Sequence, residues 1–144
     1  MTTVLKTGAW DILHIGHLNV LKIAANLGSF LVVGVATDEY IKEYKGADPA
    51  FKFHERAAII SSLRMVDAVI PYGGVEELAL IKTFNVDIIV VDQYFGVGAS
   101  AYAKRQSEAR KLMESLGLQY VIVPRTTGIS SSYIKEHINV CKEL

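Results

Sequence analysis

Residues 30–36 read Phe-Leu-Val-Val-Gly-Val-Ala, an apolar run without a charged side chain. The run has the length of a β-strand and shows no alternation of polar and apolar positions, which indicates that both faces of the strand are covered. Such strands are typical of a parallel sheet that carries helices on both sides. Shorter apolar runs occur elsewhere, and together they predict five strands: 4–5, 30–36, 68–70, 86–91 and 120–123.

Helical patterns occupy the segments between these strands. We expect helices over residues 17–27, 54–63, 100–116 and 131–140, and Gly28 and Gly117 stand where two of them should end. The order of elements predicts one α/β domain over residues 1–144, with a Rossmann-like, doubly wound sheet of five parallel strands and helices on both faces. Ligands of such sheets bind beyond the carboxyl ends of the strands, so the candidate functional loops are 7–17, 37–56, 92–99 and 124–132.

Composition narrows the classes of function. The chain has 144 residues, of which 51% are hydrophobic, enough to enclose a core without disulfides. Lys and Arg number 15 and so do Asp and Glu, and this zero net charge argues against a nucleic-acid partner. No apolar run approaches the ~20 residues of a membrane span, and residues 1–10 lack the pattern of a signal peptide. The single cysteine, Cys141, cannot form an intrachain disulfide and fits a reducing compartment. From these features together we expect a cytoplasmic protein without a membrane partner.

The loop after the first strand, Thr-Gly-Ala-Trp-Asp-Ile-Leu-His-Ile-Gly-His at 7–17, predicts a phosphate site. His14 and His17 are three residues apart, so at a helix start both imidazoles lie on the same side. The helix N-terminus adds free N–H groups and a positive dipole end, while Gly8 and Gly16 let an anion approach the backbone. The same donors could stabilise a pentacoordinate phosphorus. Two alternatives remain open here: capping or packing histidines, and a zinc pair without an evident third ligand.

The loop after the last strand, Arg-Thr-Thr-Gly-Ile-Ser-Ser-Ser at 125–132, predicts a second anion-binding segment. Gly128 permits a tight turn, and serines at a helix start can satisfy backbone N–H groups or contact an anion. Arg125 adds a planar fork of donors that suits phosphate. An ordinary serine-capped helix is the alternative interpretation of this segment.

Together these loops resemble the HxGH nucleotidylyltransferase superfamily. The first carries Gly-x-Trp-Asp-x-x-His-x-Gly-His, with Trp10 where the family usually has Phe. The last resembles the R-T-x-G-I-S-T-[ST] motif of the cytidylyltransferase branch, and the likeness extends from Gly8 to Glu136. The resemblance implies transfer of CMP from CTP to a small phosphorylated alcohol, with sn-glycerol 3-phosphate as the expected acceptor and pyrophosphate as the leaving group.

The resemblance also implies roles for particular residues. The histidines would bind the nucleotide phosphates, Lys45 would neutralise charge from a mobile loop, and Arg56 would hold phosphate from the next helix. Arg125 and Thr126 would lie near the base and ribose. The candidate catalytic residues are His14, His17, Lys45 and Arg125, and the candidate nucleotide-binding residues are Thr7, Gly8, Ala9, Trp10, Asp11, Gly16, Arg56, Asp92, Thr126, Gly128, Ile129, Ser130 and Ser131. Asp92 stands where the sequence departs from the family, and it could bind a hydroxyl or Mg²⁺.

Two further expectations concern the metal and the assembly. Mg²⁺ would be carried mainly by the triphosphate, so we expect no dedicated metal ligands from the protein. Residues 63–71 resemble a segment that contributes to a dimer contact in bacterial relatives, which implies a homodimer.

The loop after the fourth strand departs from the family. Relatives usually carry Gly-Asp or Gly-Asn there, whereas this chain has Asp92-Gln93, followed by Tyr94 and Phe95 as a lid or as packing. The acceptor should lie near this loop, so its identity stays open. The alternatives are phosphoethanolamine, phosphocholine or another phosphorylated acceptor, a heptose 1-phosphate adenylyltransferase, and a nucleotide-binding module without turnover.

Overall fold

The computed structural model describes residues 1–73, 77–93 and 97–143. Five strands form one parallel sheet in the order β3-β2-β1-β4-β5, which confirms the predicted fold class. The strands are β1 (Thr3–Gly8), β2 (Phe30–Ala36), β3 (Ala68–Tyr72), β4 (Ile88–Asp92) and β5 (Gln119–Val123). The helices are α1 (Ile15–Asn26), α2 (Asp38–Lys45), α3 (Phe53–Ser61), α4 (Glu77–Thr83), α5 (Ala101–Ser115) and α6 (Ser131–Glu143).

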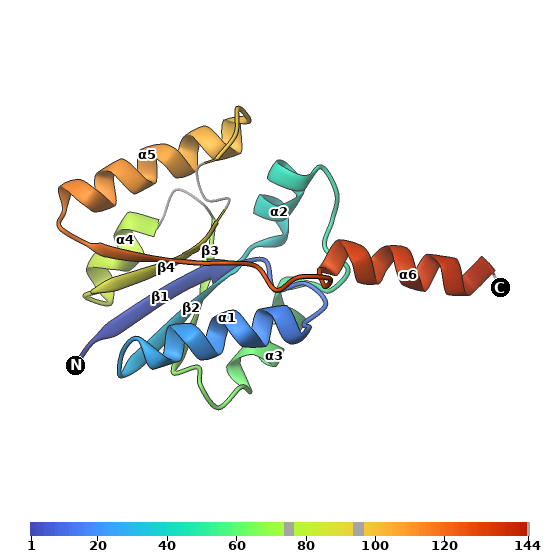
Figure 1. Ribbon diagram of the computed structural model, residues 1–144, viewed down its shortest axis with the longest axis horizontal. Coiled ribbons are helices and arrows are strands. Elements are labelled where there is room, and N and C mark those ends of the chain that lie inside the picture. The colour runs from blue at the N-terminus through green and yellow to red at the C-terminus, as the bar shows by residue number, and fades with distance from the viewer. Residues whose placement is uncertain (74–76, 94–96, 144) are drawn as a thin grey trace.

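Helices cover both faces of the sheet, as the unbroken apolar run of β2 predicts. Figure 1 shows α1 and α3 on one face and α4 and α5 on the other. Val33 and Val35 of β2 belong to the core beneath α1 and α3, and Val32 belongs to the core that includes Met113 of α5. All three side chains are fully buried. The strand therefore gains apolar contacts on both sides, which is the condition that favours a parallel sheet.

The strand order reverses direction between β1 and β4. The chain runs from β1 outward to β2 and β3, then returns to place β4 on the other side of β1. Crossovers from adjacent strands thus leave on opposite faces and open a crevice at the carboxyl ends of β1 and β4. Helix α6 begins beyond this edge and extends away from the sheet (Figure 1). The topology by itself therefore places a ligand crevice beside residues 6–17 and 90–93.

Two local predictions about the elements were wrong. We expected residues 37–56 to be a loop, but α2 occupies Asp38–Lys45, where Thr37 caps its start and Gly46 (φ 75°) ends it. A threonine cap, an acidic first turn and a following glycine are helix signals that the sequence carried. We also expected the third strand to stop before Pro71, but β3 includes it. Because β3 is an edge strand, the missing N–H of proline is tolerated there.

Arg56 is the largest fully buried side chain of the described residues, and it connects four segments. Its Nε donates to the Phe51 carbonyl at 2.9 Å, and Nη1 donates to the carbonyls of Ala9 and Ala36 at 2.7 Å each. Its Nη2 pairs with the Asp38 carboxylate at 2.6 Å. The expectation that Arg56 holds phosphate is corrected by this arrangement, because its side chain is enclosed and its donors bind protein oxygens.

Arg56→Met is expected to lower the free energy of unfolding by about 3–5 kcal/mol, since it leaves buried carbonyls and a carboxylate without their donor. Urea unfolding followed by circular dichroism measures this. Arg64→Met serves as the control, because Arg64 is exposed and should change stability little. If Arg56→Met does not fold, Arg56→Lys should still fold with an intermediate loss. Equal stability of the Arg56 and Arg64 variants would contradict the assigned role.

Candidate functional site

A cavity of about 370 Å³ lies at the carboxyl ends of the strands. It is enclosed by the loop after β1, the start of α1, the end of α2, the ends of β4 and β5, and the start of α6. Every residue predicted for the site lines it except Arg56, which lies beneath, and Gly128, which forms the turn before α6 with φ 80°. The structure therefore brings together segments that are more than a hundred residues apart in the chain.

The two histidines of the first loop are ordered by the backbone at the start of α1. His14 is the N-cap, and its Nδ1 accepts a hydrogen bond from the N–H of Gly16 at 3.0 Å. His17 Nδ1 accepts from the N–H of His14 at 3.2 Å. The rings stack with centroids 3.8 Å apart. The capping alternative is thus realised, and the capping hydrogen bonds are what orient the two rings.

These hydrogen bonds define what the histidines can offer to a ligand. A neutral imidazole whose Nδ1 accepts carries its proton on Nε2, so each ring presents an Nε2–H donor. Burial, followed by the charges of His14, Lys45 and Lys6, lowers the pKa of His17 to about 4. Burial also lowers the pKa of His14. At neutral pH the pair therefore consists of two neutral donors at a helix N-terminus, an arrangement that can bind an anion.

Gly16 is required by the position of the His14 ring. A Cβ at residue 16 would lie 2.8 Å from Cε1 and 2.9 Å from Nδ1 of His14, closer than side-chain atoms pack. The preceding turn is also constrained, because Trp10 (φ 57°) and Ile12 (φ 49°) adopt left-handed backbone conformations. The Trp10 indole donates to the Gly34 carbonyl at 2.9 Å and holds this turn against β2. The first loop is therefore pre-shaped by contacts with the sheet.

Asp11 connects the first loop to two distant segments. Its buried carboxylate accepts from the N–H groups of Ala50 (2.8 Å) and Phe51 (3.0 Å) and from Lys135 Nζ of α6 (2.9 Å). Burial raises the pKa of this carboxyl, but the hydrogen bonds from Lys135, Phe51 and Ala50 outweigh it and leave the pKa below its ordinary value. Asp11 therefore shapes the site by fixing the loop after α2 and the start of α6, rather than by facing a ligand anion.

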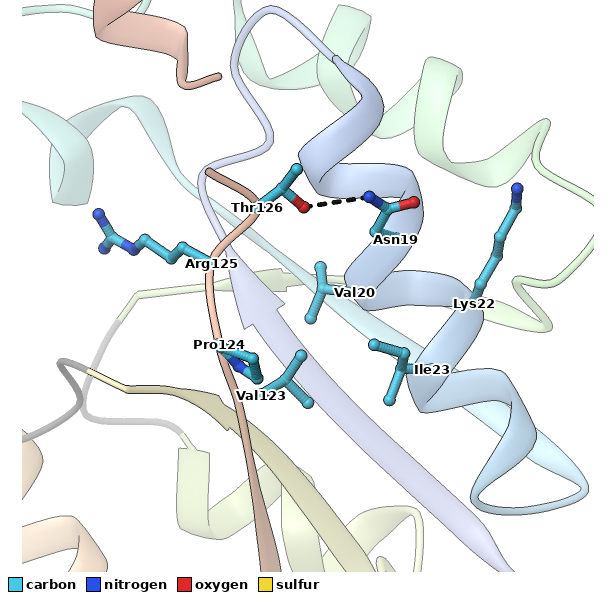
Figure 2. A pocket seen from close by; sticks show the side chains of 8 residues that line it. All are labelled: Asn19, Val20, Lys22, Ile23, Val123, Pro124, Arg125 and Thr126. Carbon is cyan, nitrogen blue, oxygen red and sulfur yellow. Dashed lines mark hydrogen bonds between the residues drawn. The ribbon is translucent and has the colours of Figure 1, made fainter. Parts of the chain in front are cut away.

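The last loop closes the other side of the cavity. Arg125 Nη2 lies 3.3 Å from the Asp92 carboxylate at the end of β4. Thr126 Oγ1 accepts from the Asn19 amide of α1 at 3.1 Å. Figure 2 shows Asn19, Arg125 and Thr126 around a second hollow between α1 and the end of β5, with the Arg125 side chain directed away from α1. The segment thus ties the ends of β4 and β5 to α1.

Of the serines at the start of α6, Ser130 caps the helix and Ser131 ties it to the first loop. Ser130 Oγ accepts from the N–H of Tyr133 at 3.1 Å, and Ser131 Oγ donates to the Asp11 carbonyl at 2.5 Å. The serine-cap alternative therefore describes Ser130 correctly. Ser130 and Ser131 also line the cavity.

A wall of three tyrosines borders the cavity on the side of α2. Tyr40 packs against Tyr44 and Tyr72, with ring centroids 4.9 and 5.3 Å apart, and all three line the cavity. Burial, with Tyr40 beside it, raises the pKa of Tyr44 to about 12, so its hydroxyl stays protonated and able to donate. The sequence analysis missed this wall, and the other aromatic candidates, Tyr94 and Phe95, lie outside the described residues.

Comparison with known proteins assigns the chain to a family. A profile described as "Cytidylyltransferase-like" matches residues 5–137. The chain belongs to the cytidylyltransferase-like family. This membership confirms the resemblance carried by the first and last loops.

Three relatives and one solved structure are similar to this member of the family. Glycerol-3-phosphate cytidylyltransferase of Bacillus subtilis is 34% identical, covering 96% of this chain and 98% of that protein. FAD synthase of Thermococcus sibiricus is 42% identical over 67% of each chain. Bifunctional protein HldE of Syntrophotalea carbinolica is 32% identical over 95% of this chain, which spans 27% of that protein. A lipopolysaccharide core biosynthesis protein from Thermoplasma volcanium matches with a TM-score of 0.67 and 31% identity, covering 88% of this chain and 97% of that one. The family and the relatives are nucleotidyltransferases, which confirms the expected enzyme class.

Cationic side chains lie in or beside the cavity of this cytidylyltransferase-like protein, and two of them, Lys6 in its lining and Lys135 beside it on Asp11, were not predicted. Lys45 ends α2 beside the histidines, and burial and the neighbouring Lys135, Arg125 and Arg56 lower its pKa, although Asp11 opposes them. Lys135, of α6, had no motif to mark it. Lys6 had one available signal, since it follows two buried residues of a predicted parallel strand, where a charged side chain is unusual.

Residues 1–73, 77–93 and 97–143 contain no group of three or more His, Cys, Asp or Glu side chains arranged to hold a metal ion. The carboxylates that line the cavity, Asp11 and Asp92, bind Lys135 and Arg125. This donor set does not fit a protein cage for Mg²⁺, which requires several oxygen ligands. In the same part of the chain, the helices lack the length and apolar character needed to cross a membrane.

The stability of the protein is expected to fall as pH decreases from about 6.5 to about 4. The unfolded chain binds a proton at residue 17 near pH 6.5 but the folded protein only near pH 4, so acid favours unfolding in this window and has no such effect above it. The loss attributable to His17 is at most about 3 kcal/mol.

Denaturant unfolding at a series of pH values measures this slope. His17→Asn keeps an acceptor for the His14 N–H but does not titrate, so its stability should fall less steeply over the same window. Asp11 and the other acidic groups are present in both wild type and His17→Asn, so the difference in slope between the two proteins reports on His17. His54→Asn, at an exposed position of α3, should retain the wild-type slope, and parallel curves for wild type and His17→Asn would contradict the assignment.

Proposed function

We propose that this protein transfers CMP from CTP to the phosphate of a small phosphorylated alcohol, with sn-glycerol 3-phosphate as the first candidate. The observation that carries the proposal is the His14–His17 pair, whose two Nε2–H donors stand at the N-terminus of α1 over the crevice between β1 and β4. The similarity to glycerol-3-phosphate cytidylyltransferase over nearly the full length of both chains supports this acceptor.

In the proposed reaction, an oxygen of the acceptor phosphate attacks the α-phosphorus of CTP in line with the bridging oxygen to the β-phosphate. A new P–O bond forms, the α–β P–O bond breaks, and pyrophosphate leaves with the bonding electrons. No covalent enzyme intermediate is needed, so the protein contributes positioning and charge stabilisation. His14 and His17 donate to phosphate oxygens, and Lys45 neutralises charge between the two substrates. Mg²⁺ supplies further charge neutralisation and arrives with the triphosphate.

The proposal also gives roles to the other residues in and below the cavity. Arg125 and Thr126 lie near the base and ribose, and Asp92 orients the Arg125 guanidinium through their contact. The backbone of Gly8 and Ala9 borders the phosphates. Arg56 supports this loop from below through the Ala9 carbonyl. We further propose a cytoplasmic homodimer, on the resemblance of residues 63–71 to a dimer segment.

A second candidate acceptor is a sugar phosphate, and the wall of Tyr40, Tyr44 and Tyr72 favours it. Tyrosine rings offer an apolar face and a hydroxyl, a combination that suits a body larger and richer in hydroxyls than glycerol. Residue 72 closes the end of β3, and residues 40 and 44 lie one helical turn apart on α2 beside Lys45.

Pyrophosphate release, measured with CTP, ATP, GTP and UTP in the presence of Mg²⁺, tests the proposal. Each nucleotide is combined with glycerol 3-phosphate, phosphoethanolamine, phosphocholine, a heptose phosphate and FMN. Release with CTP and glycerol 3-phosphate alone is the expected result. Release with CTP and a sugar phosphate would select the second candidate. Release only with ATP would overturn the choice of nucleotide, and tight CTP binding without release on any acceptor would indicate a binding module.

Lys45→Ala is expected to lower kcat by about 100- to 1,000-fold while changing the KM for CTP much less, because Lys45 is proposed to act on charge that develops in the transition state. Steady-state kinetics at saturating acceptor measures both constants. Lys42→Ala is the matched control, since Lys42 is on the same helix but is 66% exposed. A higher KM with unchanged kcat would instead make Lys45 a ground-state anchor.

A further inference from the structure

Lys6 stands at an unusual position for a charged residue. It belongs to β1, the central strand, where it lies opposite Val33 of β2 and Val90 of β4. The two residues before it, Val4 and Leu5, are fully buried, and Lys6 itself is half-buried. Central strands of parallel sheets are almost entirely apolar, and bringing an ammonium group out of water is costly. A lysine at this position is therefore unusual, and its surroundings indicate what its charge can do.

The Lys6 side chain reaches the crevice at the switch point of the sheet. Its Nζ donates to the Thr7 carbonyl at 3.0 Å and lies 5.9 Å from the centroid of the Trp10 ring. That ring is in edge contact with His17, with centroids 5.5 Å apart. Lys6 also lines the cavity, and its charge contributes to the lowered pKa of His17. The ammonium group therefore lies on the floor of the crevice, close to the pair of neutral donors.

The charges around the crevice are complementary to an anion. Lys45 approaches the crevice from α2, and its charge helps to lower the pKa of His17. Lys135, on α6, pairs with Asp11, and its charge helps to lower the pKa of Lys45. Cations that share a partly desolvated site repel one another, and this repulsion is relieved when a polyanion binds among them. Lys6 is the one of these three lysines that belongs to the sheet itself, on β1 opposite Val90 of β4.

We propose that Lys6 is a phosphate-binding residue, whose ammonium group contacts an oxygen of the nucleotide triphosphate from the floor of the β1–β4 crevice. The inference rests on the proposed function for the presence of a nucleotide, and it adds a ligand from the sheet to those supplied by the loops. A charge-assisted hydrogen bond of this kind is expected to strengthen binding by about 10- to 100-fold.

Isothermal titration with inorganic tripolyphosphate, and separately with CTP, tests this without an acceptor. Lys6→Met keeps the apolar stem and removes the charge, so its affinity for both anions should fall by about 10- to 100-fold. The dependence of affinity on ionic strength should also become shallower, a change that a purely structural lysine would not cause. Lys6→Arg should retain most of the affinity. Lys111→Met, at an exposed position of α5, carries the same charge change and should bind as wild type does.

The outcomes separate this inference from the proposed function. Equal affinity of wild type and folded Lys6→Met for tripolyphosphate, at every ionic strength, would overturn the role of Lys6 and leave the proposed function intact. Weaker binding by Lys6→Met, in a protein that releases no pyrophosphate with any acceptor, would support Lys6 as an anion ligand while the proposed transfer failed. If Lys6→Met does not fold, loss of affinity in a folded Lys6→Arg would equally overturn the inference. Absence of binding by wild type would overturn both.

Discussion

The buried guanidinium of Arg56 is the interaction on which the site depends. It binds the Ala9 carbonyl of the first loop, the Ala36 carbonyl at the end of β2, the Phe51 carbonyl of the following loop, and Asp38 at the start of α2. Loops carry backbone groups that must be satisfied when they are buried, and a planar side chain with several donors can satisfy them together. The carboxyl edge of the sheet is therefore organised around one charge.

Above this support, the protein combines neutral donors with cations that are held apart. The histidines are kept neutral by burial and by the charges around them, and their Nδ1 atoms are occupied by the backbone. Their donor function consequently does not depend on protonation near neutral pH. Positive charge around the crevice comes from lysines on three separate elements: Lys6 on β1, Lys45 on α2 and Lys135 on α6. An anion that binds here meets preorganised dipoles together with positive charge, an arrangement that favours stabilisation of a developing negative charge.

The sequence predicted the parts of this arrangement that are local. The apolar run at 30–36 and the spacing of His14 and His17 each depend on a few neighbouring residues, and both appear in the structure as expected. The expected parallel sheet placed the loops at 7–17 and 124–132 at the same edge, and the fold brings them together through Asp11 and Ser131. The helix at 38–45 was missed although its capping signals are local, because the segment was interpreted as a functional loop.

By itself, then, the sequence determined the sheet, the start of α1 and the family, because periodicity, caps and motifs act over short stretches of chain. The tertiary structure decided which charged residues face the cavity and which lie beneath it. Arg56 and Lys6 show the difference: the residue expected at phosphate is enclosed beneath the loop, and the unpredicted lysine reaches the crevice. The physical reason is that the free energy of a charged side chain depends on its distance from other charges and from water. Those distances are set by segments that meet only when the whole sheet has formed.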